Sequence, residues 1–328
     1  MLNIGDLSIE NPVILAPMEG ITDLPFRLIC KELGADIVYS EFIAAEALIR
    51  DAEKSFAKMK IAEKERPVVI QIFGSKIGSM VESAKIVEDA GADILDINFG
   101  CWVKKVVNNQ AGAAFLKEPE RMAEMVEALN NAVSIPVTAK TRLGWDKNSI
   151  VILDVARLLE QAGCHALAVH CRTRDMAMKG DADWSWGKRI KEAVKEMPII
   201  INGDIRSHKD AERAFAETEC DGIMIGRAAV GNPFIFKQTK QYLEENIEPE
   251  DITHREKINI CKKHLDLTIE LKGIPRGLYE FRKHYTGYLK GFHSASNVRQ
   301  KLVQLLDYDQ IIKTLDEYSD QLSQIDMR

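Results

Sequence analysis

Residues 92–116 read ADILDINFGCWVKKVVNNQAGAAFL, and the rest of the chain is organised around this stretch. It begins with a short apolar run over residues 93–98, interrupted by Asp96, which indicates a strand. Asn98 ends the run, and Gly100 is expected to free the backbone for a turn. The stretch therefore predicts a buried strand followed by a tight turn.

Cys101 follows this turn directly, with Lys104 and Lys105 close behind it in the sequence. Neighbouring cations favour the thiolate and raise the reactivity of a cysteine. Taken alone, a free cysteine at a strand end is more often a small buried side chain. The rest of the chain has to decide between a reactive and a structural thiol.

Eight strand-like runs alternate with helical stretches over the first 240 residues. The runs are almost continuously apolar, which is typical of a parallel sheet covered on both faces. Eight strand–helix units favour a closed (β/α)8 TIM barrel, of the α/β class, over an open sheet. No GxGxxG follows the first run, which argues against a dinucleotide-binding Rossmann domain. The predicted strands span 13–18, 36–42, 67–73, 93–98, 136–141, 166–170, 198–202 and 222–225, and the predicted helices span 23–33, from 44, 77–90, 118–131, 149–162, 184–195, 207–216 and from 232.

In such a barrel the chemistry lies on the loops that follow the strands. Each polar residue in these loops, taken alone, could have a purely structural role. Burying several cations without a ligand costs folding free energy, however, so the group as a whole indicates a binding site. The loops after the last two strands are suited to phosphate, through backbone N–H groups and a guanidinium. We therefore predict an enzyme with a phosphate-bearing cofactor, whose ring faces Lys140, and a cysteine acid or nucleophile. The residues concerned are Pro17, Met18, Glu19, Gln71, Asn98, Cys101, Lys140, Arg142, His170, Arg172, Asn202, Gly203, Asp204, Gly226 and Arg227.

Composition excludes several other classes of protein. The 328 residues carry a net charge of −6, so bulk electrostatics do not indicate a nucleic-acid-binding protein. The six cysteines form no Cys-x-x-Cys pair, and we expect no metal site. No apolar run approaches a membrane span and the first ten residues do not resemble a signal peptide, so we expect a cytoplasmic protein with reduced thiols.

From about residue 242 the pattern changes to helices without strands, which predicts a barrel over 1–240 and a smaller helical domain over 241–328. Residues 255–301 hold 11 Lys or Arg against 4 acids, in a chain that is negative overall. Aromatic residues interleave with these cations, which suits RNA, although a helical bundle with an aromatic core explains the pattern equally well. The acidic segment 307–328 is expected to pack or fray away from RNA. The aromatic residues are Tyr279, Phe281, Tyr285, Tyr288 and Phe292.

Seven motifs, taken in order, resemble those of the flavin-dependent tRNA-dihydrouridine synthases of bacteria. The similarity is dense over 1–240 and looser beyond. The motifs are APMEGITD at 16–23, QIFG at 71–74, DINFGC at 96–101 with Lys104-Lys105 and Ala111-Gly112, KTR at 140–142, HCRT at 170–173, NGDI at 202–205 and IGR at 225–227.

This resemblance implies an FMN cofactor reduced by NADPH, and reduction of the C5–C6 bond of a uridine in tRNA to dihydrouridine. Hydride would pass from FMN to C6, while Cys101 would protonate C5. It implies Asn98, Lys104, Lys105 and Arg142 as contacts of the RNA, a flipped uridine, and an RNA-binding helical domain. DNA and membranes are not expected partners, and we expect a monomer. The implied FMN ligands are Pro17, Met18, Glu19, Gln71, Lys140, His170, Asn202, Gly203, Asp204, Gly226 and Arg227.

Two residues depart from the pattern of the family. Trp102 stands where the family usually has proline, and Cys171 stands where it usually has glycine. Trp102 changes the loop that carries the thiol, and an indole there is able to stack on a base. The alternatives left open are a flavin oxidoreductase acting on rRNA uridine or a free pyrimidine, and an RNA-binding scaffold without activity.

Overall fold

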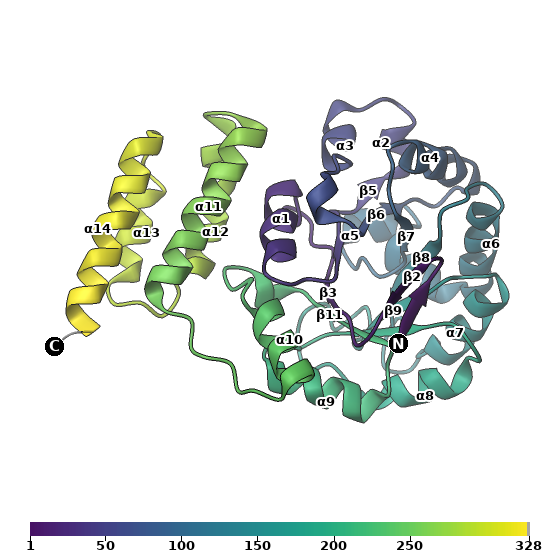
Figure 1. Cartoon of the computed structure of the whole chain (residues 1–328). Helices are drawn as coiled ribbons and strands as arrows, with labels where there is room; N and C mark the ends of the chain where they lie inside the picture. Colours follow the sequence, from purple (N-terminus) through teal and green to yellow (C-terminus); the bar gives the residue numbers. More distant parts are fainter. Residues whose placement is uncertain (327–328) are drawn as a thin grey trace.

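The computed structural model describes residues 1–326 and contains the predicted barrel (Figure 1). Eight parallel strands follow one another around it, and pairing of β4 with β6 closes the ring. The short β5 (Ile43–Ala44) continues the sheet along β6. The barrel strands are β3 (Val13–Leu15), β4 (Ile37–Tyr39), β6 (Val68–Phe73), β7 (Ile94–Asn98), β8 (Val137–Arg142), β9 (Leu167–His170), β10 (Ile199–Asn202) and β11 (Gly222–Ile225).

The register of the strands aligns their polar ends. Asn98 of β7 lies opposite Lys140 of β8. Arg142 of β8 lies opposite His170 of β9, and His170 in turn lies opposite Asn202 of β10. Because the strands are parallel, these side chains gather at one end of the barrel.

Helices cover the outside of the barrel because alternate strand residues face outward and are apolar. Two of these helices begin at side-chain N-caps: Asp23 accepts from Phe26 N at 3.3 Å, and Ser207 accepts from Asp210 N at 3.1 Å. The helices are α1 (Leu24–Glu32), α2 (Ala45–Leu48), α3 (Glu53–Lys58), α4 (Ile77–Asp89), α5 (Lys104–Asn108), α6 (Pro119–Asn130), α7 (Ile152–Gln161), α8 (Ser185–Ala193), α9 (His208–Thr218) and α10 (Ile235–Glu245), with 3-10 turns at Glu63–Glu65, Gly112–Lys117 and Arg227–Ala229.

A hairpin that the sequence pattern did not predict precedes the barrel. It consists of β1 (Leu2–Ile4) and β2 (Leu7–Ile9). Leu2 and Ile4 are buried in one cluster with the strand residues that point inward, such as Ile14 and Val69. The hairpin therefore closes the amino-terminal end of the barrel, and the opposite end remains for the site.

The carboxyl-terminal region is helical, as predicted. It comprises α11 (His254–Lys272), α12 (Arg276–Tyr288), α13 (Ala295–Leu302) and α14 (Tyr308–Asp326), which have a hydrophobic core of their own. Helix α10 runs past residue 240, so we place the change of domain in the segment 246–253, slightly later than expected. The acidic α14 packs against α11, where Asp316 pairs with Lys262.

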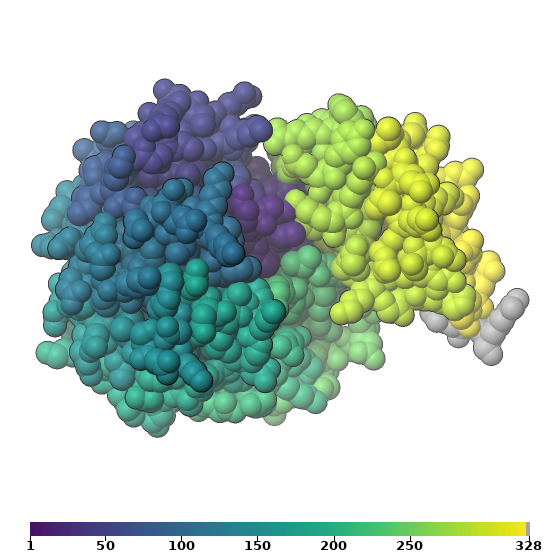
Figure 2. Space-filling model, turned by 180° about the vertical axis from the view of Figure 1, so that it is seen from behind, coloured from purple at the N-terminus to yellow at the C-terminus, as the bar shows by residue number. Residues whose placement is uncertain are grey.

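The helical region is held against the barrel through α1 (Figure 2). The ring of Phe26 in α1 lies 5.5 Å from that of His264 in α11 and 5.6 Å from that of His284 in α12. Two ion pairs frame this contact: Lys272 with Asp23, and Lys263 with Glu32. Within residues 1–326, no helix is both long enough and apolar enough to span a membrane.

Candidate active site

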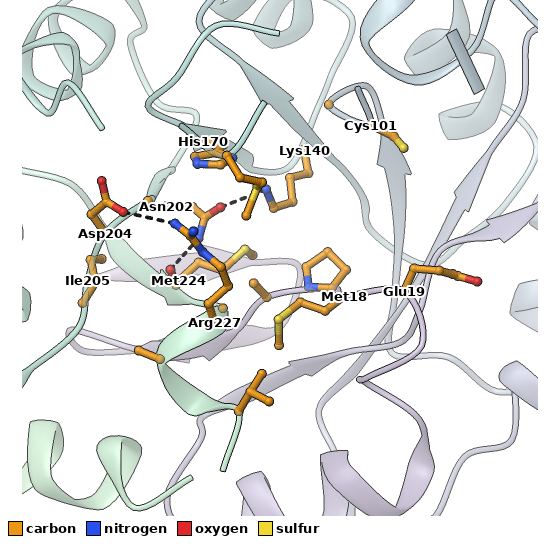
Figure 3. A pocket seen from close by; sticks show the side chains of 18 of the residues that line it. Met18, Glu19, Cys101, Lys140, His170, Asn202, Asp204, Ile205, Met224 and Arg227 are labelled. Carbon is orange, nitrogen blue, oxygen red and sulfur yellow. Dashed lines mark hydrogen bonds and ion pairs between the residues drawn. The ribbon is translucent and has the colours of Figure 1, made fainter. Parts of the chain in front are cut away.

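A cavity of about 1040 Å3 opens at the carboxyl ends of the strands (Figure 3). The helical region also reaches it, through Lys257 of α11, Gly287 of α12 and Lys290 in the turn after α12. Most of the predicted site residues line this cavity. They are Pro17, Met18, Glu19, Asn98, Cys101, Lys105, Lys140, Arg142, His170, Asn202, Gly203, Asp204, Gly226 and Arg227.

Three predicted residues do not line the cavity: Gln71, Lys104 and Arg172. Lys104 is exposed on α5, while its neighbour Lys105 faces the cavity. Gln71 is buried beneath the floor, where Nε2 donates to Asp96 at 2.7 Å and Oε1 accepts from Asn98 at 2.9 Å. Its polar atoms therefore support other residues of the site.

Asn98 positions the cysteine loop. Its Oδ1 accepts from the backbone N–H of Gly100 at 3.0 Å and of Cys101 at 2.9 Å. Gly100 does not adopt a positive φ, whereas Gly112 in the following segment does, with φ of +59°. A Cβ there would come within 2.8 Å of the carbonyl oxygen of Cys101, so only glycine lets the two segments approach.

The thiol of Cys101 keeps its proton at neutral pH. Burial raises its pKa, although the backbone N–H of Val103 and the guanidinium of Arg142 oppose the shift. Lys104 and Lys105 are not among the groups that change it. The expectation of a thiolate favoured by these two lysines is therefore wrong, because removal from water outweighs the nearby charge. A half-buried protonated thiol is suited to giving a proton away.

Asp96 was missed as part of the site, because it resembled an ordinary polar residue in a strand. It is fully buried and accepts from Thr138 Oγ1 at 2.7 Å as well as from Gln71. Burial raises its pKa to about 6, against the hydrogen bonds from Thr138 and Gln71. A chain of bonds therefore runs from Asp96 through Gln71 and Asn98 to the backbone of Cys101.

Lys140 extends from β8 into the cavity. Its Nζ donates to Asn202 Oδ1 at 3.1 Å, and Asn202 Nδ2 donates to the Met224 carbonyl at 2.7 Å. Burial and the charge of Arg142 lower the pKa of Lys140 to about 8. Within residues 1–326 no carboxylate forms an ion pair with it, so the ammonium has room for an electron-rich acceptor from a ligand.

Arg142 joins the walls around the thiol. Its Nε donates to the Gly100 carbonyl at 2.9 Å, and its Nη1 donates to the carbonyls of Thr173 and Ala177 at 3.1 and 2.8 Å. The guanidinium thus ties the cysteine loop to the loop that follows β9. Its positive charge also lies close enough to act on the thiol of Cys101.

Arg172 determines which nitrogen of His170 carries the proton. The Arg172 Nη1 lies 2.9 Å from His170 Nε2, and a guanidinium is only a donor. Nε2 must therefore accept, which leaves the hydrogen of the neutral ring on Nδ1. Burial, followed by the charges of Arg142 and other cations, lowers the pKa of His170 well below its usual value. His170 is a neutral donor at the cavity wall.

Asp204 organises three arginines. Its Oδ2 pairs with the buried Arg172 and accepts from the Ala182 N–H at 2.8 Å, while Oδ1 faces Arg206 at 2.9 Å and Arg227 at 3.2 Å. Burial alone would raise its pKa, but these donors hold it well below the usual range. The side chains of Arg206 and Arg227 remain more than half exposed at the ends of β10 and β11, where they are available to an anion.

The aromatic residues of the helical region do not form a surface for bases. Phe281, Tyr285 and Tyr288 are buried in the core of the bundle, and only Tyr279 among the five is exposed. Of the two explanations left open by the sequence, the aromatic core is confirmed for these three residues, because helical spacing turns them inward. Several of the cations are also taken by ion pairs with Asp316, Glu32, Asp23 and Glu280.

The cavity is nonetheless strongly positive. Seven cations line it against two carboxylates, Glu19 and Asp204. Trp102, Phe42, Met178 and Arg206 also line it, and of these only Trp102 drew attention in the sequence. The seven cations are Lys105, Lys140, Arg142, Arg206, Arg227, Lys257 and Lys290.

Comparisons with known proteins agree with this geometry. The model of a family described as dihydrouridine synthase (Dus) matches residues 14–323. A probable tRNA-dihydrouridine synthase of Rickettsia bellii is 37% identical over 300 residues, which cover 91% of this chain and 92% of that protein. tRNA-dihydrouridine synthase B of Proteus vulgaris is 35% identical over 317 residues, which cover 97% of this chain and 98% of that protein.

Two solved structures share the fold at low sequence identity. A 2-naphthoyl-CoA reductase complex has a TM-score of 0.58 at 13% identity, and covers 74% of this chain and 51% of its own. Histamine dehydrogenase from Rhizobium sp. 4-9 has a TM-score of 0.54 at 13% identity, and covers 81% of this chain and 50% of its own. At this identity the likeness supports the barrel alone.

Proposed function

The chain belongs to the dihydrouridine synthase family, and on that premise we propose that it reduces uridine in tRNA to dihydrouridine, with FMN as its bound cofactor and NADPH as the reductant. The observation that carries the proposal is that one cavity holds both a protonated thiol, Cys101, and a lysine, Lys140, that forms no ion pair with a carboxylate of residues 1–326.

The donor groups of the cavity fit FMN. Arg206 and Arg227 would hold its phosphate at the ends of β10 and β11, where the fold commonly binds phosphate. Lys140 and the Nδ1–H of His170 would donate to the electron-rich atoms of the isoalloxazine ring. When bound and reduced by NADPH, FMN would supply the hydride that adds to C6 of the uracil.

The chain itself would supply the proton. As negative charge develops on the uracil, Cys101 Sγ–H would protonate C5, and water would return a proton to the thiolate. The guanidinium of Arg142 would stabilise the thiolate during this exchange. Asn98 would keep the thiol in position through its bond to the Cys101 N–H, and Gln71 and Asp96 would support Asn98.

The substrate would approach as folded RNA. A uridine must leave its stack to meet Cys101, and the cations at the mouth of the cavity, Lys105, Lys257 and Lys290, would bind the phosphates on either side. Since Lys257 belongs to α11 and Lys290 lies in the turn after α12, the helical region would take part in RNA binding. We expect the enzyme to act in the cytoplasm as a monomer.

Nucleoside mass spectrometry tests the proposal. Cells that lack the protein should lose dihydrouridine at a defined tRNA position, and wild type but not Cys101→Ala should restore it. Cys171→Ala is the matched control, because this thiol lies near the site but is fully buried. If dihydrouridine is unchanged in tRNA but lost from rRNA, the substrate is rRNA. Restoration by Cys101→Ala would support a scaffold role, and no change in either RNA would favour a free pyrimidine substrate.

A further inference from the structure

Trp102 differs from the other tryptophans of the chain. The remaining three each have a cation over the ring, at 3.8 to 5.5 Å from the centroid. Trp102 makes no ring contact, hydrogen bond or ion pair with any residue of 1–326, and 38% of its surface is exposed. The partnered residues are Trp145 with Lys117 and Arg174, Trp184 with Arg213, and Trp186 with Arg189.

The loop that carries this exposed indole is well fixed. On one side, Cys101 N donates to Asn98, and Cys101 O accepts from Ala113 N at 3.0 Å. On the other side, the carbonyl of Val103 accepts from the first turn of α5. The ring is therefore held at the wall of the cavity without being needed to pack the fold. The 38% of its surface that stays exposed is available to a ligand.

The surroundings of Trp102 indicate the chemistry of its partner. Lys105, Lys257 and Lys290 line the same cavity, so an apolar planar ring and several cations share its wall. An aromatic platform within a positive groove is the arrangement that binds single-stranded nucleic acid, with bases on the ring and phosphates on the cations. The cavity volume of about 1040 Å3 lies at the upper limit for a site that binds one small molecule, which leaves room for a nucleotide beside a cofactor.

We propose that Trp102 stacks on the nucleobase next to the flipped uridine. This inference rests on the proposed function and adds a further RNA-binding residue to it. Flipping a base leaves its neighbour with one uncovered face, and costs a few kcal/mol in lost stacking. Because Trp102 follows Cys101 directly and is exposed at the wall, its indole is placed to cover that face while the uracil lies at the thiol.

Steady-state kinetics of the holoenzyme test this role, with total tRNA from cells lacking the protein as the probe. Loss of one base–aromatic stack, about 1–3 kcal/mol, corresponds to a rise in KM for tRNA of about 5- to 150-fold in Trp102→Ala. Trp102→Phe keeps a ring and should stay within about threefold of wild type, as should kcat in both variants. Trp186→Ala, on the outer helix α8, is the control and should leave KM unchanged.

Fluorescence supplies a readout that does not depend on turnover. Adding tRNA should quench the emission that wild type has and Trp102→Phe lacks. If Trp102→Ala forms dihydrouridine with an unchanged KM, and tRNA does not quench the wild-type emission, the stacking role of Trp102 is overturned. The proposed function is then unaffected. The stacking role is also overturned if Trp102→Ala lowers kcat, or lowers flavin reduction by NADPH without RNA, and does not raise KM. The ring would then only support Cys101. Quenching without any dihydrouridine formation supports the RNA contact and overturns the proposed function.

Discussion

Replacing Arg172 with methionine should change the protonation of His170. Arg172 is almost fully buried and donates to His170 Nε2 at 2.9 Å. A hydrogen bond from a charged donor is worth about 1.5–3 kcal/mol, which corresponds to a factor of about 10 to 150 in favour of the ring with its proton on Nδ1. The substitution removes that preference, so the ring with its proton on Nε2 becomes populated. The pKa of His170 should also rise, although burial, Arg142, Lys140 and Arg227 continue to lower it.

The assay is nitrogen NMR of histidine-labelled protein without cofactor, with His170→Gln to assign the signal. The wild-type ring should remain neutral, with its proton on Nδ1, at and above the ordinary histidine pKa of about 6.5. Arg206→Met is the matched control, because Arg206 contacts the same carboxylate of Asp204 but does not contact His170. Arg172→Lys keeps a cation beside Asp204. Comparing it with Arg172→Met shows whether loss of the buried charge pair, and not of the hydrogen bond to His170, has disturbed the fold.

Two results would refute this reasoning. One is a wild-type His170 that carries its proton on Nε2, or is positively charged, at pH 7. The other is an Arg172→Met spectrum identical to that of wild type, which would mean that the surrounding cavity, and not the guanidinium, selects the proton position. If the expectation holds, His170 meets its ligand as a neutral donor and not as a cation.

Three other changes test separate parts of the structure. Cys101→Ala should lower the rate of RNA reduction by about 100- to 10,000-fold and spare flavin reduction by NADPH. Wild-type activity should fall as the pH rises through the raised pKa of the Cys101 thiol, because the acid must be protonated; a fall that is already complete below the ordinary thiol pKa of about 8.5 would contradict this. FMN affinity, measured by flavin fluorescence, should weaken by up to about tenfold per pH unit above pH 8, where Lys140 loses its charge. Lys140→Arg should remove this pH dependence, and the same slope in that variant would assign the dependence to another group. Arg27→Met should lower the free energy of unfolding in urea by about 3–5 kcal/mol, because it leaves the buried Glu65, which Arg27 Nε contacts at 2.6 Å, without its ion-pair partner. Adding Glu65→Leu to that variant should recover part of the loss, whereas a loss below about 1 kcal/mol in Arg27→Met would show that water reaches the pair.

Much of the architecture was predictable from local patterns. Apolar runs separated by amphipathic stretches predicted the barrel strands and most of the outer helices, because each pattern has its own period and its own stop signals. The rule that barrel chemistry lies after the strands then placed Cys101, Lys140 and His170 together. The hairpin over residues 2–9 was missed because its two strands are only three residues each.

Contacts between distant segments were beyond the reach of the sequence. Whether Lys104 or Lys105 faces the cavity depends on the orientation of α5, and whether Phe281 packs inward depends on its neighbours in the bundle. The effect of burial on Cys101 likewise appears only once the surrounding loops are in place.

The sequence by itself therefore determined the kind of fold and the composition of the site, because period, chain order and residue type are local properties. The tertiary structure alone decided the proton on the thiol of Cys101, the tautomer of His170 and the reach of Lys257 and Lys290 over the cavity. Each of these depends on charge, solvent exposure or a hydrogen-bond partner contributed by a segment that folding brings close, and such effects vary with distance in space and not with separation along the chain.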